Sequence, residues 1–301
     1  MQFVQQLING LTIGAFYALV ALGYTMVYGV LKLINFAHGD MFMWGAYLGL
    51  TGLNVAVALL SGGSALMLIP VIILVMATMA LVGVLVERVA YRPLRSAGRL
   101  APVISALGVA FILQSLARNV YGASWKTYPN VLKLGGRISI GGGASIAVMQ
   151  IVVLAISFAL MGALYLFIQR TRIGTAMRAV SLDHDVSRLM GIDVNRIIAI
   201  VFLIGPGLGG IAGVIVGVYY GSFDFTLGWV FGLKAFIAAI LGGIGNIPGA
   251  MLGGMILGII ETLGAGYLSP QWKDVLAYLI LIVILIFRPT GLLGERVAEK
   301  L

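Results

Sequence analysis

Apolar runs of about twenty residues recur along nearly the whole chain and constrain its fold more than any other feature. A helix needs about 20 apolar residues to cross the hydrocarbon core of a bilayer. The runs are continuous, whereas the strands of a membrane β-barrel alternate in segments of about ten residues. The sequence therefore predicts an all-α, polytopic transmembrane bundle of about eight or nine spans in one domain, residues 1–301. The expected helices lie at about 7–30, 41–60, 65–86, 102–120, 147–168, 197–220, 228–241, 250–267 and 274–288.

The composition agrees with a chain that lies mostly in lipid. Hydrophobic residues make up 61% and charged residues 10%, whereas a soluble domain carries about a quarter charged residues. The net charge of +9 gathers in short loops, as the positive-inside rule expects, so it does not indicate nucleic-acid binding. The absence of cysteine excludes disulfides, thiolate metal sites and thiol catalysis, and we predict no metal site.

Three basic segments predict the orientation of the chain in the membrane. They are residues 87–99, the insert 170–196 and the tail from Arg288, and positive charge favours the cytoplasmic side. An even number of spans separates each from the next, which is consistent with one side for all three and for the C-terminus. The loop at about 121–146 and the N-terminus are then expected on the opposite side. The basic residues of the first segment and the tail are Arg88, Arg92, Arg95, Arg99, Arg288, Arg296 and Lys300.

Two polar or glycine-rich breaks interrupt the apolar sequence, near 29–40 and 228–250. Residues 28–45 (YGVLKLINFAHGDMFMWG) fit two interpretations: a cytoplasmic turn in which Asp40 caps the next helix, or a loop that lines a solute path. Residues 241–254 (LGGIGNIPGAMLGG) form the second break, and the short run before them is either a crossing or half of a re-entrant hairpin. Interrupted hydrophobic segments in both halves of a chain indicate a transport site.

Lys234 and Glu261 flank the second break inside apolar sequence. A charge at membrane depth costs several kcal/mol unless it is paired or reaches the interface. In an antiparallel hairpin the two residues would differ in depth by roughly 6 Å, which long side chains can cover. The sequence therefore predicts an intramembrane ion pair, and charge reversal at both positions is expected to restore what either single change loses.

Glycine recurs every fourth residue in several of the predicted helices. Such spacing lets helix backbones approach closely in lipid. Tight internal packing and a surface on which helices slide both fit the pattern. The series are Gly205, Gly209, Gly213, Gly217 and Gly221; Gly245, Gly249 and Gly253; and Gly254 with Gly258.

The insert at residues 170–196 combines apolar and charged residues outside the spans. Val186, Leu189 and Met190 share one face of a helix expected between Gly174 and Gly191. Ser181 is expected to open this helix or to cap a second turn, with Gly191 at its C-terminal end and Asp193 capping the next span. Apolar side chains among charges of both signs indicate docking of a protein partner, although a solvated loop that only fixes topology remains an alternative.

Four motifs together resemble a known family of membrane proteins. They are INFAHGD, ERVAYRPLR, RAVSLDHDVSRLMGIDVNRI and LKAFIAAILGGIGNIPGAMLGGMILGIIE. In this order they resemble the inner-membrane permeases of branched-chain amino acid ABC importers, and most closely the shorter of the two permease subunits. The resemblance extends from Gly10 to Gly294, nearly the whole chain.

The resemblance implies a division of labour among subunits. Such permeases pair with a second, homologous permease, bind two cytoplasmic ATPase subunits, and receive substrate from a periplasmic binding protein. It implies that residues 176–191 are the helix that couples the ATPases to the permease. The candidate coupling residues are Arg178, Ser181, Leu182, Asp183, Asp185, Val186, Arg188, Leu189, Met190 and Gly191. The candidate translocation-path residues are Asn35, Phe36, His38, Gly39, Asp40, Gly242, Gly243, Gly245, Asn246, Pro248 and Gly249.

The chain itself lacks the G-x-x-x-x-G-K-[ST] phosphate loop of ATPases. If ATP drives the process, ATP and Mg²⁺ must bind partner subunits, and we expect no cofactor in this chain. The function implied is passage of leucine, isoleucine, valine or a related small neutral amino acid across the bacterial inner membrane. The alternative is a self-contained secondary transporter or channel for urea, an amide or an amino acid, which leaves the insert unexplained. No serine–histidine or paired-aspartate constellation supports an intramembrane enzyme.

Overall fold

The computed structural model describes residues 2–59, 65–95, 97–98, 100–129, 136–141 and 144–294. Arg99, Arg296 and Lys300 of the predicted basic segments lie outside the described residues. Seven of the described helices are long and apolar enough to cross a membrane, α9 is a shorter apolar helix, and α11 is a largely apolar helix of 16 residues. The nine apolar helices are α1 (Gln2–Leu31), α2 (His38–Leu59), α3 (Leu68–Val86), α4 (Leu100–Tyr121), α5 (Val148–Arg170), α8 (Val194–Tyr220), α9 (Leu227–Gly242), α10 (Ile247–Tyr267) and α11 (Trp272–Phe287).

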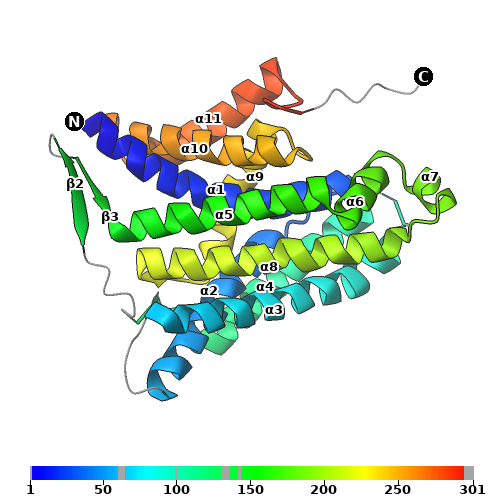
Figure 1. The fold of residues 1–301 in the computed structure, drawn as a ribbon, viewed down its shortest axis with the longest axis horizontal. Coiled ribbons are helices and arrows are strands. Elements are labelled where there is room, and N and C mark those ends of the chain that lie inside the picture. The colour runs from blue at the N-terminus through cyan, green and yellow to red at the C-terminus, as the bar shows by residue number, and fades with distance from the viewer. Residues whose placement is uncertain are drawn as a thin grey trace.

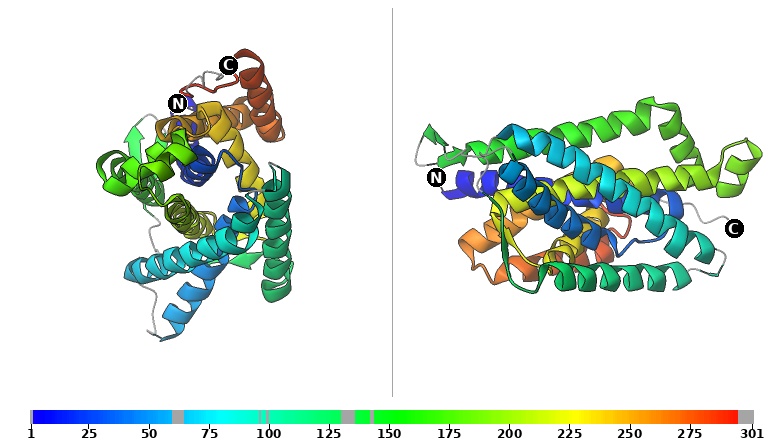
Figure 2. Two further views of the ribbon diagram at one scale, coloured as in Figure 1. Left: turned by 90° about the vertical axis from the view of Figure 1, so that its right-hand side faces the viewer. Right: turned by 90° about the horizontal axis from the view of Figure 1, so that it is seen from below.

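These helices confirm the predicted all-α polytopic bundle. Each overlaps one expected run, and the bundle is elongated with the N-terminus at one end and α7 at the other (Figure 1). We call these the N-terminal end and the α7 end. Viewed along the long axis, α11 lies at one edge of the bundle (Figure 2, left). The remaining helices are α6 (Arg172–Leu182), α7 (His184–Leu189), a π-helix (Glu87–Tyr91) and 3₁₀ turns at Ala65–Met67 and Arg92–Leu94.

Two short pairs of strands lie outside the helices. Strand β1 (Lys126–Thr127) pairs antiparallel with β4 (Ser222–Phe223), and β2 (Arg137–Gly141) pairs with β3 (Ala144–Ala147). The Tyr128 ring, which follows β1, fills a slot against Gly217, and its hydroxyl donates to the Ala46 carbonyl of α2. Tyr128 thereby fixes the chain after β1 to the middle of α2 and to the end of α8.

The most extensive helix contact among the described helices joins α1 to α10. Gly258 lies against the backbone of Gly14, and Gly254 lies against the backbone of Ala18. Small residues four apart on both helices bring the backbones together, where van der Waals contact drives association in lipid. This seam fits the close packing that the Gly254 and Gly258 spacing predicts.

We expect Gly258→Ala to destabilise the bundle, because the new methyl group would meet the Gly14 backbone at less than ordinary contact distance. Overpacking of this kind costs about 1–3 kcal/mol. Gly162→Ala in α5 is the matched control, since nothing lies near its Cβ position. Thermal unfolding in detergent should show a lower midpoint for Gly258→Ala and no loss for Gly162→Ala; equal midpoints would contradict the seam.

The glycine series of α8 serves two purposes. Gly205 faces Gly23 of α1, Gly213 faces the backbone of Phe42 in α2, and Gly209 faces His38. These positions let α8 pack closely on α1 and α2. Gly221 differs from the others, because it ends α8 in the left-handed conformation with φ of 72°, which suits a residue without a Cβ.

Candidate functional site

The first break enters the bundle as irregular backbone. We call residues 32–37, between α1 and α2, the path loop. Asn35 and His38 are fully buried, and Asp40 is 5% exposed. Asn35 accepts a hydrogen bond from the Ala37 amide at 3.1 Å, so its side chain supports the start of α2 at His38. The predicted cap at Asp40 is wrong: this residue lies inside the first turn, because the helix begins three residues earlier than expected.

The start of α2 lies among α1, α8 and α9. The His38 ring packs on Gly23 and Gly209, and edge-on against Tyr24 with ring centroids 5.0 Å apart. Gly39 lies against Gly228 and Gly232 of α9. Glycine on three helices therefore makes room for the polar INFAHGD segment inside the bundle. Phe36 tilts against Phe236 of α9, with centroids 6.0 Å apart.

The second break is a tight turn at the α7 end. Gly243 and Gly245 have φ of 106° and 99°, which glycine adopts without a steric penalty. The Asn246 side chain caps α10 by accepting from the Gly249 amide at 2.9 Å. Proline in the first turn of a helix loses no hydrogen bond, and Pro248 occupies that turn.

The glycine-rich turn of the second break approaches the first break near the end of α1. The Cβ position of Gly245 lies 3.8 Å from the Gly29 Cα atom near the end of α1, while Gly242 packs on Gly249 within the turn itself. The deep residues His38 and Gly39 instead contact α8 and α9. The predicted path residues therefore form a deep group and a group at the α7 end.

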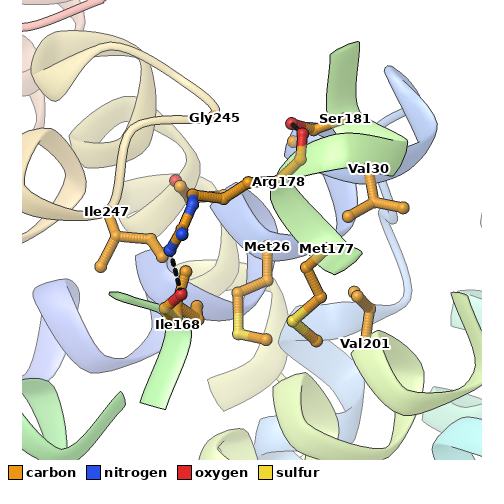
Figure 3. Close-up of a pocket in the computed structure, with 11 residues that line it drawn as sticks. Met26, Val30, Ile168, Met177, Arg178, Ser181, Val201, Gly245 and Ile247 are labelled. Carbon is orange, nitrogen blue, oxygen red and sulfur yellow. Dashed lines mark hydrogen bonds between the residues drawn. The ribbon is translucent and has the colours of Figure 1, made fainter. Parts of the chain in front are cut away.

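A small cavity of about 70 Å³ separates the second break from the insert. Met26 and Val30 of α1, Met177 of α6 and Val201 of α8 surround it, and Gly245 lies at its edge (Figure 3). Space next to a packed helix permits a shift without compressing the core. The cavity lies between α6, α1 and the start of α10.

The insert forms two helices, α6 and α7, instead of one helix over residues 176–191. Asp183 has an extended backbone conformation and separates α6 from α7. Its carboxylate accepts hydrogen bonds from the amides of Asp185 and Val186 at 2.9 and 3.1 Å. The cap of the second turn is therefore Asp183, and Ser181 instead donates to the Arg178 carbonyl at 2.7 Å. Gly191, with φ of 81°, follows α7, and Asp193 caps α8 as predicted.

Apolar side chains cover the outer side of the insert. Leu189 is 87% exposed and Leu182 is 85% exposed. Large exposed apolar patches bounded by charges are typical of protein interaction sites. We call this region the docking surface; it comprises Leu182, Val186, Leu189 and Met190, with the Arg188–Asp185 ion pair (3.0 Å) beside it.

Arg178 and Ser181, also predicted for coupling, face the opposite way. The Arg178 guanidinium donates to the Ile168 carbonyl at the end of α5, next to the cavity (Figure 3). Gly174 packs on the same turn of α5, and the Thr171 hydroxyl accepts from its amide at 3.0 Å. These contacts fix the start of α6 to the end of α5.

The structure brings Lys234 and Glu261 together at 3.0 Å. Glu261 is fully buried, and it also accepts from the Tyr17 hydroxyl at 2.8 Å. Sequence reasoning missed two further charges at the start of α11: Asp274 lies 2.7 Å from the Lys234 ammonium, and the Lys273 ammonium lies 3.7 Å from Glu261. Two cations and two anions therefore attach α11 to α9 and α10. The adjacent Lys273 and Asp274 at the start of α11 were the sequence signal that could have indicated this cluster.

A second charged cluster lies at the end of α3. The buried Glu87 carboxylate binds Arg92 at 2.8 Å and also binds Arg95, and Arg95 donates to Asn195 at the start of α8 at 2.8 Å. Burial lowers the pKa of the Arg95 guanidinium, while the Glu87 charge opposes that shift. Tyr91, in the π-helix, donates to the Asn35 side chain at 2.9 Å. The ERVAYRPLR motif thus connects the insert to the path loop.

Similarity to known proteins establishes the family of this chain. The fold and the insert define a multi-pass membrane protein with an exposed apolar patch at one end. Residues 6–285 match the family model for the branched-chain amino acid transport system permease component, and the chain belongs to this family. No solved structure matches.

Curated relatives cover the full length. The chain is 43% identical over 301 residues to the high-affinity branched-chain amino acid transport system permease protein BraD of Pseudomonas aeruginosa, covering 99% of this chain and 98% of that protein. It is 41% identical over 312 residues to LivH of Escherichia coli, with 100% and 98% covered. A probable LivH permease of Methanocaldococcus jannaschii is 28% identical over 288 residues, with 92% and 88% covered.

Proposed function

We propose that this chain is the inner-membrane permease subunit of an ATP-driven importer for branched-chain or related small neutral amino acids. Its similarity to BraD and LivH along the full chain supports the substrate class. The observation that carries the ATP-driven mechanism is the docking surface, because exposed apolar side chains on a charged insert suit a soluble partner. ATP and Mg²⁺ would bind that partner.

The proposed assembly places a second homologous permease beside this chain, identical or different. One of two ATPase subunits would bind the docking surface on the cytoplasmic side, and a periplasmic binding protein would deliver the amino acid at the N-terminal end. The basic residues of 87–95 and of the insert gather at the α7 end, where Arg95 contacts Asn195. The positive-inside rule therefore supports a cytoplasmic α7 end and C-terminus.

Translocation would depend on movement of the two breaks and would not involve a chemical reaction of any side chain in this chain. The path loop is irregular backbone that enters the bundle, where such backbone is tolerated only if it is buried or lines a cavity, and the α9–α10 turn borders the cavity at Gly245. ATP binding would move α6 and α7, and the cavity at Met177 and Gly245 would accommodate the shift. The deep group at Asn35 to Asp40 would then separate from α9 and open a route.

Reconstitution tests this proposal. The chain is co-expressed with its neighbouring transporter subunits, purified in mild detergent and placed in liposomes that contain ATP or a non-hydrolysable analogue. We expect two ATPase subunits to co-purify and leucine uptake to require hydrolysable ATP and binding protein. Uptake by the chain alone, driven by a sodium or proton gradient, would instead support a secondary transporter.

A further inference from the structure

His184, at the start of α7, contacts α1 directly although sequence reasoning assigned it no role. Its Nε2 atom lies 2.7 Å from the Val30 carbonyl oxygen, and because a carbonyl can only accept, the imidazole N–H donates. The last carbonyls of a helix have no partner within that helix, and Val30 is in the last turn of α1. The His184 side chain at the start of α7 therefore supplies a hydrogen-bond donor to the last turn of α1.

The chain changes direction immediately after this contact. Lys32 has φ of 55°, the left-handed conformation, which is unfavourable for a residue with a Cβ. Residues held in such conformations are found in switch regions, where the surrounding structure maintains them. The path loop begins here, so a small displacement of Val30 would change the direction in which the loop enters the bundle.

The far side of the path loop is held by different contacts. Tyr91 donates to Asn35 at 2.9 Å, and Tyr91 belongs to a π-helix that continues into the Glu87–Arg95 cluster. A π-helical turn inside a helix is often found at a functional site. The loop is thus attached to α7 on one side, through Val30, and to the end of α3 on the other.

We propose that His184 is a positioning residue that transmits movement of α7 to the path loop through its hydrogen bond to the Val30 carbonyl. This inference rests on the proposed function. The Tyr91–Asn35 bond holds one side of the loop while His184 moves the other side. Because only one side of the loop moves, His38 and Asp40 are displaced. The docking surface and the deep path residues are thereby connected by one hydrogen bond and six residues of loop.

Substitutions at His184 separate coupling from folding. His184→Gln keeps an N–H donor, whereas His184→Leu keeps apolar volume without one. In proteoliposomes containing the assembled importer, L-leucine uptake and ATP hydrolysis are measured together. We expect His184→Leu to raise the ATP hydrolysed per leucine by roughly three- to tenfold, the range that one ordinary hydrogen bond supports, and His184→Gln to stay within about twofold of the parent.

An unchanged ratio in His184→Leu, or equal loss in both variants, would overturn the proposal. If the leucine variant does not assemble, His184→Ala supplies the same measurement. Failure of both to assemble, with normal assembly of the glutamine variant, would assign His184 to folding and also overturn it. The parent importer separates the two claims: absence of ATP-dependent uptake there contradicts the proposed function, whereas normal uptake with an unchanged variant ratio contradicts only the role of His184.

Discussion

Leu189→Asp is expected to abolish ATP-driven leucine uptake while the variant still folds and reaches the membrane. The Leu189 side chain is 87% exposed, so a carboxylate there remains hydrated in the isolated chain. In a complex, the partner would have to bury that charge without a counter-ion, which costs several kcal/mol. Loss of about 3 kcal/mol in docking energy lowers binding by roughly a factor of a hundred. Uptake and the amount of co-purified ATPase are measured in the same preparation.

Leu268→Asp is the matched control for this prediction. Leu268 follows α10 near the N-terminal end and is 64% exposed, so the substitution introduces the same charge at a similarly exposed leucine. We expect normal ATPase binding in this variant. Unchanged uptake in Leu189→Asp, or equal loss of ATPase from both variants, would remove the docking surface from the mechanism.

Glu261→Gln is expected to lower the free energy of unfolding by about 3 kcal/mol. Breaking a buried ion pair by removing one partner typically costs about 3–5 kcal/mol, because the other charge is left uncompensated. The loss falls at the lower limit because Lys234 keeps Asp274 at 2.7 Å. Thermal unfolding in detergent measures the effect, and Asp185→Asn is the control, since that ion pair with Arg188 is exposed to solvent and such pairs contribute little.

The four-charge cluster also changes the expected result of charge reversal. Sequence alone favours rescue by Lys234→Glu with Glu261→Lys, because the pair would be kept. In the structure the swap would place a carboxylate at position 234 beside Asp274 and an ammonium at position 261 beside Lys273. We therefore expect the double variant to remain less stable than the parent. A midpoint equal to that of the parent would show that α11 does not share the cluster.

The helices were predictable because lipid requires continuous apolar sequence. The nine expected runs correspond to the nine apolar helices, and the spacing of Gly254 and Gly258 anticipated a close seam. Asp193 was identified as a cap because a carboxylate before an apolar run satisfies free amides. These features depend on local composition and spacing, which one sequence contains in full.

The contacts between distant segments were not predictable from spacing. Tyr91 meets Asn35 across 56 residues, and His184 meets Val30 across 154; nothing in the local pattern of either segment specifies its partner. The insert was expected as one helix because Val186, Leu189 and Met190 share a face, but Asp183 satisfies amides better as a cap than inside a helix. The pairing of Asp274 with Lys234 was not predicted because the two residues lie on different helices.

Site-specific cross-linking tests directly whether an ATPase subunit binds the docking surface. The chain contains no cysteine, so one cysteine at position 189 or 268 carries the only thiol-reactive photo-cross-linker on this subunit. With the importer in native membranes, we expect a probe at position 189 to capture an ATPase subunit and a probe at position 268 not to capture one. Capture of the periplasmic binding protein from position 189, or of an ATPase from position 268, would contradict this expectation.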